Sequence, residues 1–422
     1  MTETTVTHNT ATPTGDHSAS LSGSLQATGM PPSAAKQRYR GVDLARGLAL
    51  VGMMFIHVIP DRAGGDPTLS WQIFAGRSSA LFALVAGLSL SFMSGGTRPP
   101  GPGRRATAAV SITVRALCIT AIGLTLALAT DGISVILAYY GLLFLCCVPL
   151  LWLPSRVLAG LGLLAGVAGP LLIFWLARHA PASAFLDEDP EFSHLSEPLA
   201  MLWRLTVTGT YPAAAWVTFL LVGLAAGRRL DVRTPRYAAR LLVGGIALAA
   251  ATRFASFLLL DSIGGVRGLA TRTDGISPNG VRRIITWGFD TMLPTDTAWW
   301  LATMGPHTST PLSILHTLGT SMAVLGLCLL ITRRARRWLN PLVWAGTMPL
   351  STYTLHVLLT SLVLAGWVDQ WLSLLAQLIV LGSLASWWAT RFGQGPLETV
   401  LSALARAASR HLVSAPAGST TS

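Results

Sequence analysis

The stretch RYRGVDLARGLALVGMMFIHVIPD, residues 38–61, decides the fold. Its apolar run is long enough to cross a membrane as a helix, which takes about 20 residues. Nine further apolar runs follow, each marked off by Gly, Pro or charged residues. Such continuous runs exclude outer-membrane strands, whose apolar residues alternate over about ten residues. The sequence therefore predicts an all-α fold, a polytopic bundle of about ten transmembrane helices near 43–60, 74–95, 107–129, 132–152, 157–177, 212–227, 238–260, 311–332, 341–365 and 371–390.

The composition agrees with a membrane protein. Of 422 residues, 51% are hydrophobic and 11% are charged, whereas about a quarter are charged in a soluble domain. The net charge of +12 comes from Arg runs between apolar stretches, which favours orientation in a bilayer over nucleic-acid binding. The four cysteines lie in apolar runs without metal-ligand spacing, so neither a disulfide framework nor a zinc site is predicted.

Arginines in the loops orient the bundle. The even-numbered connections, 96–106, 153–156, 228–237 and 333–340, carry 12 Arg residues and one acidic residue, Asp231. An excess of basic residues marks the cytoplasmic side, so both termini are predicted to be cytoplasmic in a multi-pass protein of the inner (plasma) membrane. The two long connections, 178–211 and 261–310, then lie outside, where long loops are usually functional.

The chain divides into three parts. Residues 1–37 are rich in Thr, Ser, Gly and Pro and are expected to form a disordered cytoplasmic tail. Residues 38–405 form the predicted transmembrane domain, and residues 406–422 a short cytoplasmic tail.

The first helix carries ionisable residues at both ends. Asp43 and Arg46 are three residues apart and can pair near the cytoplasmic end. His57 follows Arg46 by eleven residues, which places both on one face about 16 Å apart along the axis. Asp61 could accept a hydrogen bond from one nitrogen of His57 and leave the other free as a base. Alternatively, the ion pair anchors the helix end and His57 bonds a neighbouring helix.

Further polar residues lie in other predicted helices. His316 and His356 join His57 in the outer half of the bilayer, where they are candidates for catalysis, for interhelical hydrogen bonds or for metal binding. Arg77, followed by Ser78, lies at the outer entrance of the second helix and Arg115 lies inside the third. Each guanidinium could bind an anionic substrate group, whereas Arg77 could also extend to the interface.

Several motifs resemble a known family. RGVDLARGLALVGMMFIH (40–57) resembles the first helix of the YeiB-like bacterial membrane proteins. These are grouped with heparan-α-glucosaminide N-acetyltransferase and the bacterial envelope sugar acyltransferases. GRSSALFALVAGLSLS (76–91), MPLSTYTLHVLL (348–359) and RFGQGPLE (391–398) are similar to further signatures of the YeiB-like branch.

The resemblance implies a bundle of ten or eleven helices with a central pore. Acyl-CoA, acetyl-CoA first among them, would approach from the cytoplasm, and a sugar or cell-envelope glycan would accept the acyl group on the far side. The spacing of Arg46 and His57 is similar to that of the sugar acyltransferases, which implies a role in transfer for both. Those enzymes often carry an Arg-x-Arg pair in the third helix, of which only Arg115 is found.

Two main classes of function stay open. As an acyltransferase, the protein would use His57 to activate an acceptor hydroxyl or amine that attacks an acyl thioester or an acyl-enzyme; no metal is predicted. As a transporter or flippase of an acylated or anionic metabolite, it would line a path with Arg46, Arg77 and Arg115. Transporters often show internal repeats and broken helices, and the absence of an evident repeat favours the enzyme. A structural or sensory protein would not need these residues, and an oligomer is compatible with either function.

Overall fold

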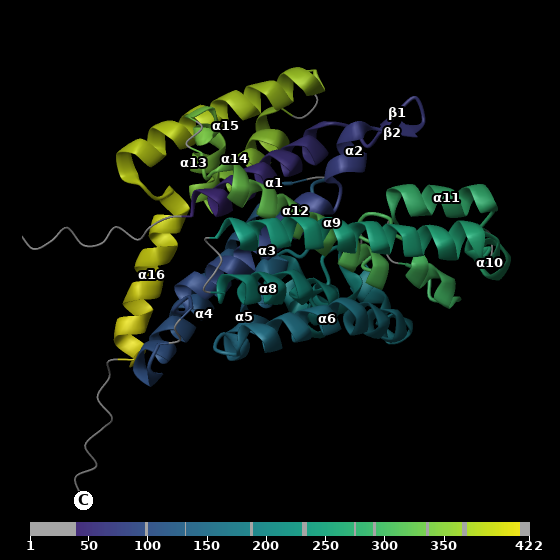
Figure 1. The fold of residues 1–422 in the computed structure, drawn as a ribbon, viewed down its shortest axis with the longest axis horizontal. Helices are drawn as coiled ribbons and strands as arrows, with labels where there is room; N and C mark the ends of the chain where they lie inside the picture. The colour runs from purple at the N-terminus through teal and green to yellow at the C-terminus, as the bar shows by residue number, and fades with distance from the viewer. Residues whose placement is uncertain are drawn as a thin grey trace, which may run out of the picture. The chain divides into compact units, whose positions relative to one another are not determined.

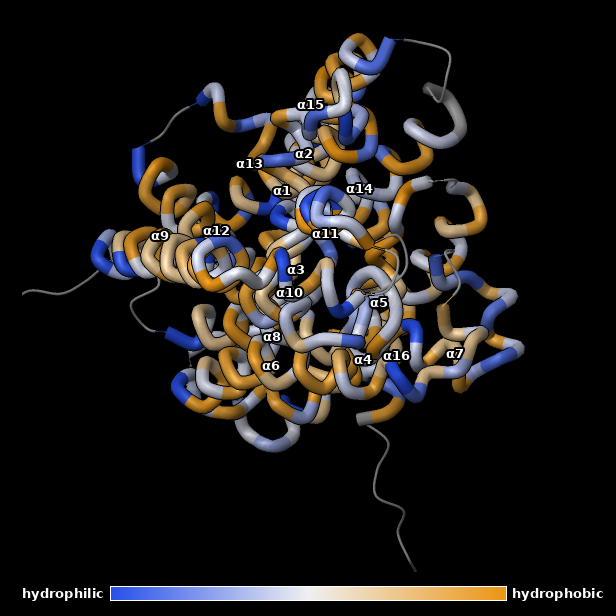
Figure 2. Tube along the Cα trace, turned by 90° about the vertical axis from the view of Figure 1, so that its right-hand side faces the viewer, coloured by the Kyte–Doolittle hydropathy of each residue, from blue (hydrophilic) through white to orange (hydrophobic). Residues whose placement is uncertain are grey.

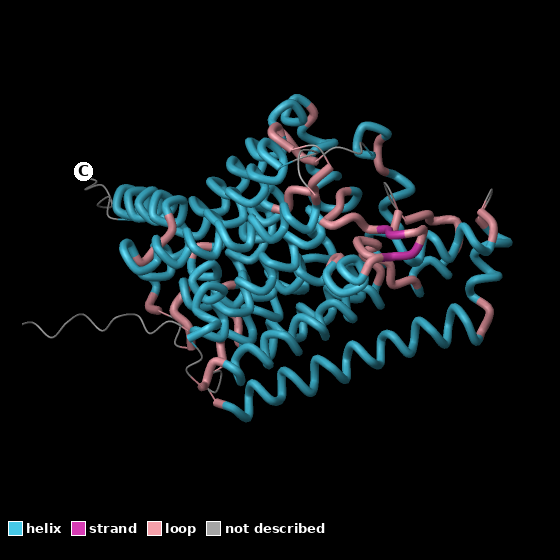
Figure 3. Tube along the Cα trace, turned by 90° about the horizontal axis from the view of Figure 1, so that it is seen from above, coloured by secondary structure: helices cyan, strands magenta, loops and turns pink. Residues whose placement is uncertain are grey.

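The structure, a computed structural model, describes residues 39–97, 100–130, 132–185, 189–229, 234–273, 276–289, 293–334, 337–364 and 369–413. The predicted tail 1–37 lies outside the described residues. The all-α prediction is confirmed, because the described chain consists almost entirely of helices and connecting loops (Figures 1 and 3). Its one small sheet is an antiparallel hairpin of β1 (Arg62–Ala63) and β2 (Asp66–Pro67).

The α-helices follow one another along the whole described chain. They are α1 (Arg40–Val58), α2 (Leu69–Phe74), α3 (Arg77–Met93), α4 (Pro102–Ala127), α5 (Leu137–Cys147), α6 (Ser155–Leu176), α7 (Pro198–Trp203), α8 (Ala213–Gly227), α9 (Pro235–Phe257), α10 (Gly265–Arg272), α11 (Pro278–Trp287), α12 (Pro311–Ile331), α13 (Asn340–Thr347), α14 (Pro349–Leu358), α15 (Gln370–Phe392) and α16 (Pro396–Val413).

Local sequence signals explain several helix starts. The Thr234 and Thr310 side chains accept hydrogen bonds from the first turns of α9 and α12, each followed by proline at the first helical position. Asp369 caps α15 by accepting from the backbone N–H groups of Trp371 and Leu372. Such caps satisfy amide groups that have no partner within the helix.

Fewer helices of the described chain meet the length and apolarity of a membrane span than the sequence predicts. Among the described residues, seven helices are long and apolar enough to cross a membrane, or eight if a bent pair, 198–208 with 213–227, is one span. The predicted span at 132–152 becomes the shorter apolar segment 137–150. The predicted span at 341–365 is broken between α13 and α14, where Met348 leaves the helical conformation before Pro349. The count of ten is therefore not confirmed.

The break between α13 and α14 is stabilised from another part of the chain. Oε1 of Glu398, in the first turn of α16, accepts hydrogen bonds from the backbone N–H groups of Leu350 (2.8 Å) and Ser351 (3.2 Å). A carboxylate is favourable there, because the start of a helix carries partial positive charge. The motifs 348–359 and 391–398 thus meet in space.

The helices divide into central and peripheral ones. In the apolar window of the span Leu69–Met93, which includes α3, 72% of residues are buried, whereas in that of the span Pro235–Ser262, which includes α9, only 22% are. Hydrophobic residues occur along much of α6, α9 and α15 (Figure 2). Leu164, Val243 and Ile379 among them are more than half exposed. Exposed apolar surface on this scale fits contact with lipid.

The terminal helix differs from the prediction of a tail beginning at residue 406. Helix α16 continues to Val413, and residues 414–422 lie outside the described part of the chain. It packs along α4 (Figure 1), where Ser409 Oγ donates a hydrogen bond to the carbonyl of Thr107.

Candidate functional site

Two histidines that are 299 residues apart in the sequence meet between α1 and α14. Nδ1 of His57 lies 2.9 Å from Nε2 of His356. The two rings are nearly parallel, with an angle of 3° between their planes and 5.2 Å between their centroids. At this distance one nitrogen donates a hydrogen bond and the other accepts it. The structure thus brings together two of the three predicted helix histidines.

The pair continues into a third helix. Nδ1 of His356 lies 2.6 Å from Oε1 of Gln377 in α15. His356 and Gln377 are each 1% exposed, whereas His57 is only half-buried. Nε2 of His57 has no hydrogen-bond partner among the described residues. The arrangement is therefore a chain of three side chains, buried at the Gln377 end and open at His57.

Helix ends position both imidazoles. His57 lies in the last turn of α1, which ends at Val58 because Ile59 is extended and Pro60 follows. His356 lies in the last α-helical turn of α14. The break at Met348 sets the start of α14 and therefore the direction in which His356 projects.

The expected pairing of His57 with Asp61 is wrong. The helix does not continue through Asp61, since Pro60 cannot supply the backbone N–H of another helical turn. Asp61 instead accepts a hydrogen bond from Nε of Arg62 at 3.0 Å, on the exposed hairpin. The partner of His57 is His356.

The predicted ion pair at the other end of α1 is present. Nη1 of Arg46 lies 2.5 Å from Oδ1 of Asp43 and 3.3 Å from the carbonyl oxygen of Gly346 in α13. Nη2 of Arg46 donates a hydrogen bond to Oγ of Ser89 in α3 at 2.6 Å. The guanidinium thus connects three helices.

Arg46 also borders a cavity inside the bundle. The cavity has a volume of about 210 Å³ and is enclosed by α1, α3, α4, α5 and α14. Its wall is largely apolar, with Phe82, Phe144 and Leu350, and its polar groups include Arg46, Ser89 and Tyr353. Tyr353 precedes His356 by three residues on α14, so the cavity borders the same helix that carries His356, about one turn earlier.

A further buried imidazole, that of His307, lies in the loop between α11 and α12. His307 has a positive φ of 57°, which is uncommon for a residue other than glycine and often marks a functional site. Burial lowers the pKa of His307 to about 4, against the opposing effect of its hydrogen bond to the Thr210 backbone. His307 is therefore neutral at pH 7.

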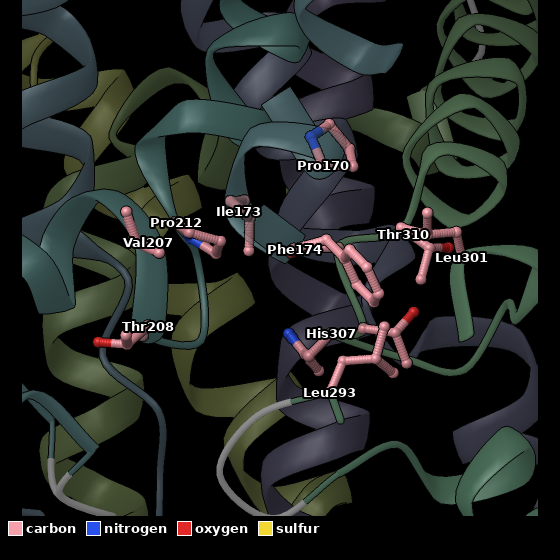
Figure 4. A pocket seen from close by; sticks show the side chains of 13 residues that line it. Pro170, Ile173, Phe174, Val207, Thr208, Pro212, Leu293, Leu301, His307 and Thr310 are labelled. Carbon is pink, nitrogen blue, oxygen red and sulfur yellow. The ribbon is translucent and has the colours of Figure 1, made fainter. Parts of the chain in front are cut away.

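His307 lines a small pocket between the end of α6 and the loops that precede α8 and α12 (Figure 4). The pocket has a volume of about 40 Å³, and the side chains of Phe174, Leu293 and Thr310 border it. Nδ1 of His307 is buried without a hydrogen-bond partner among the described residues. A water molecule or a small polar group would fit this space.

The remaining predicted residues lie elsewhere. His316 contacts the carbonyl oxygen of Ala249 at 3.0 Å, which matches the interhelical alternative and separates it from the other two histidines. Arg77 donates to the carbonyl oxygen of Gln72 at 2.6 Å. Ser78 is buried where α3 passes Gly52 of α1. Arg115 donates to Oγ of Ser402 at 2.9 Å and therefore faces α16, not the cavity.

Metal binding finds no support in the arrangement of the histidines. Across the described ranges, no group of three or more His, Cys, Asp or Glu side chains is placed to hold a metal ion.

Sequence reasoning missed three residues of this region. Gln377 and Ser89 lie in apolar helices, and a lone polar residue in a membrane span is the signal that could have identified Gln377. His307 lies in a long connection, and its burial depends on the path of that connection, which no local pattern predicts.

Comparison with known proteins gives two matches to protein families. Residues 277–408 match the family described as a protein of unknown function, DUF418. Residues 38–259 match the family described as heparan-alpha-glucosaminide N-acetyltransferase, catalytic. No curated protein matches the chain. His57 lies in the matched region 38–259 and His356 in the matched region 277–408, so the histidine pair joins the two regions. The chain, a multi-pass membrane protein with the YeiB-like motifs, belongs to the heparan-alpha-glucosaminide N-acetyltransferase catalytic family.

Proposed function

We propose that this protein transfers an acyl group, acetyl first among the candidates, from acyl-CoA on the cytoplasmic side to a sugar or envelope acceptor on the opposite side of the inner membrane. The family match supports membrane acetyltransferase chemistry. The observation that carries the proposal is the hydrogen-bonded pair of His57 and His356, on the two helices, α1 and α14, that also line the cavity bordered by Arg46.

The histidine pair is suited to accepting a proton. An acceptor amine or hydroxyl becomes a better nucleophile when a base removes its proton during attack. His57 would take that proton at its free Nε2 while the acceptor forms a bond to the carbonyl carbon of the acyl group. The carbon–sulfur bond of the thioester then breaks, and the thiolate that leaves receives the proton. If an acyl-enzyme forms first, His57 would serve the same acceptor in the second step.

Arg46 is suited to the donor side. Coenzyme A carries phosphate groups, which a guanidinium binds through charge-assisted hydrogen bonds. Arg46 lies near the N-terminal end of α1, which the Arg-rich loops predict to be cytoplasmic. The apolar walls of the cavity beyond it suit the less polar part of an acyl thioester. The family name suggests an amino sugar as the first acceptor to test.

A second candidate, transport of an acylated or anionic metabolite, is favoured by one observation. The bundle contains a bent pair, Pro198–Thr208 with Ala213–Gly227, whose parts differ in direction by 59°, and a break between α13 and α14. Broken helices at a binding site are typical of transporters. The Glu398 contact accounts for the second break without a transported ligand.

Inverted inner-membrane vesicles test the proposal, because their cytoplasmic face is outside. Radiolabelled acetyl-CoA is added outside and glucosamine is trapped inside, with vesicles from a deletion strain as the control. The proposal predicts N-acetylglucosamine inside and free coenzyme A outside. Labelled acetyl-CoA that accumulates inside without acetylated sugar would indicate transport and contradict the transferase.

A further inference from the structure

We infer that Gln377 is a positioning residue that sets the tautomers of His356 and His57, so that Nε2 of His57 is the atom that accepts the proton. This inference rests on the proposed function for the role of His57. The tautomers themselves follow from the hydrogen bonds alone. Gln377 would act through His356, without contact with the substrate.

The orientation of the Gln377 amide follows from Thr360. Oγ1 of Thr360 lies 3.0 Å from the carbonyl oxygen of His356, one helical turn earlier, and donates its proton to it. The hydroxyl has a single proton, and its other possible acceptors are farther away, with Oε1 of Gln377 at 3.2 Å and Nδ1 of His356 at 3.4 Å. With its proton on the carbonyl of His356, the hydroxyl accepts from Nε2 of Gln377, which lies 3.1 Å away. The amide nitrogen therefore faces Thr360, and the amide oxygen, Oε1, faces Nδ1 of His356 at 2.6 Å.

The amide oxygen of Gln377 fixes the tautomer of His356. An amide oxygen can only accept a hydrogen bond, so Nδ1 of His356 must carry a proton. In a neutral imidazole the other nitrogen, Nε2, is then an acceptor. That acceptor lies 2.9 Å from Nδ1 of His57.

The tautomer of His57 follows from that of His356. Because Nε2 of His356 accepts, Nδ1 of His57 must donate and carries the proton. Nε2 of His57 is then the unprotonated nitrogen, on the half-buried ring that has no partner there among the described residues. The chain from Gln377 thus leaves a lone pair at the open end of the site, as an oriented base requires.

Gln377 is a neutral hydrogen-bond partner of His356, whereas a carboxylate in its place would add a negative charge. Gln377 is 1% exposed and His356 is equally buried, so a charge here would be costly without compensation. The amide oxygen selects one tautomer without adding charge. The pair can therefore stay neutral before the acceptor is bound, with the proton taken up only during attack.

Nitrogen-15 solid-state NMR of the histidine-labelled protein in lipid tests this directly. The signals of His57 and His356 are assigned by their loss in His57→Gln and His356→Gln. We expect both residues as the Nδ1–H tautomer in the wild type, although free imidazole side chains in water favour Nε2–H. A wild-type His57 in the Nε2–H form would overturn the inference, and this measurement needs no variant of Gln377.

Variants of Gln377 test whether the tautomers that it sets are needed for acyl transfer. Gln377→Leu should abolish the fixed tautomer and lower acetyl transfer to glucosamine by about 10–100-fold, the range for loss of a group that orients a functional histidine. Gln377→Glu, as the neutral acid that this burial favours, keeps an acceptor oxygen towards His356 and a donor towards Thr360, and should retain both the tautomer and most of the transfer. Gln370→Leu, on the exposed first turn of the same helix, is the matched control and should change neither.

The outcomes separate this inference from the proposed function. Equal loss of transfer in Gln377→Leu and Gln377→Glu, or a tautomer unchanged in Gln377→Leu, would contradict the positioning role. Undiminished transfer in His57→Gln, with the predicted tautomers present in the wild type, would contradict the proposed base while the role of Gln377 in setting the tautomers stands.

Discussion

Replacement of Arg46 by alanine should weaken the binding of coenzyme A. The guanidinium is held towards the cavity by hydrogen bonds to Asp43 at 2.5 Å and Ser89 at 2.6 Å, so its position is fixed before the donor arrives. A charge-assisted contact from such a group to a phosphate is worth about 1.5–3 kcal/mol. That corresponds to an increase of about 10–150-fold in Kd.

Isothermal titration of the purified protein with coenzyme A measures this change. Arg46→Lys keeps the charge without the planar fork and should lie between the wild type and Arg46→Ala. Asp43→Asn distinguishes binding from stability: if the ion pair only holds the helices together, Asp43→Asn should reproduce the effect of Arg46→Ala. An unchanged affinity in a folded Arg46→Ala protein would refute the donor-site reasoning.

Three further predictions concern packing, pH and topology. A methyl group on Gly245 would lie 2.5 Å from the Gly319 oxygen, whereas one on the adjacent Gly244 meets nothing within 4 Å. Gly245→Ala should therefore destabilise the protein by about 1–3 kcal/mol, and Gly244→Ala should stabilise it slightly. Equal thermal unfolding temperatures for the two variants would contradict this packing. Burial raises the pKa of Asp189, in the loop before α7, to about 6 despite its hydrogen bond from Val135. The stability that protonated Asp189 contributes is thus present below pH 4 and is lost as the pH rises through 6. The free energy of unfolding of Asp189→Asn, relative to that of the wild type, should therefore increase by about 1–2 kcal/mol between pH 4 and 7. A difference between the two proteins that is constant with pH would argue against this role of Asp189. In a background without native cysteines, Ser193→Cys should react with an impermeant thiol reagent in intact cells and Arg334→Cys should not, and the reverse pattern would invert the topology.

The sequence was informative about the fold wherever one local pattern sufficed. The apolar run after Arg40 predicted α1, and the spacing of Asp43 and Arg46 predicted their ion pair. The breaks were harder, because Met348 and Pro349 lie within an apolar run and the contact that stabilises their turn comes from Glu398. The count of spans depended on such tertiary contacts.

The site was only half predictable for the same reason. His57 and His356 were each identifiable as polar residues in apolar helices, yet their contact joins segments 299 residues apart. The pairing with Asp61 failed because it extended the helix past Pro60. Arg115 was predicted inside the third helix as a candidate for binding an anionic group, but its partner is Ser402 of α16. The sequence predicted the last residues of that helix to be part of a tail.

The role of His57 as the base is tested most directly by acetyl transfer in purified, reconstituted protein. His57→Gln keeps a polar group but cannot accept the proton, whereas His316→Gln makes the same change at a histidine that contacts only Ala249 in the hydrogen bonds of the described chain. We expect His57→Gln to bind coenzyme A normally and to lose transfer by about 10²–10⁴-fold, while His316→Gln stays near the wild-type rate. Transfer at the wild-type rate by His57→Gln, or an equal loss in both variants, would contradict it.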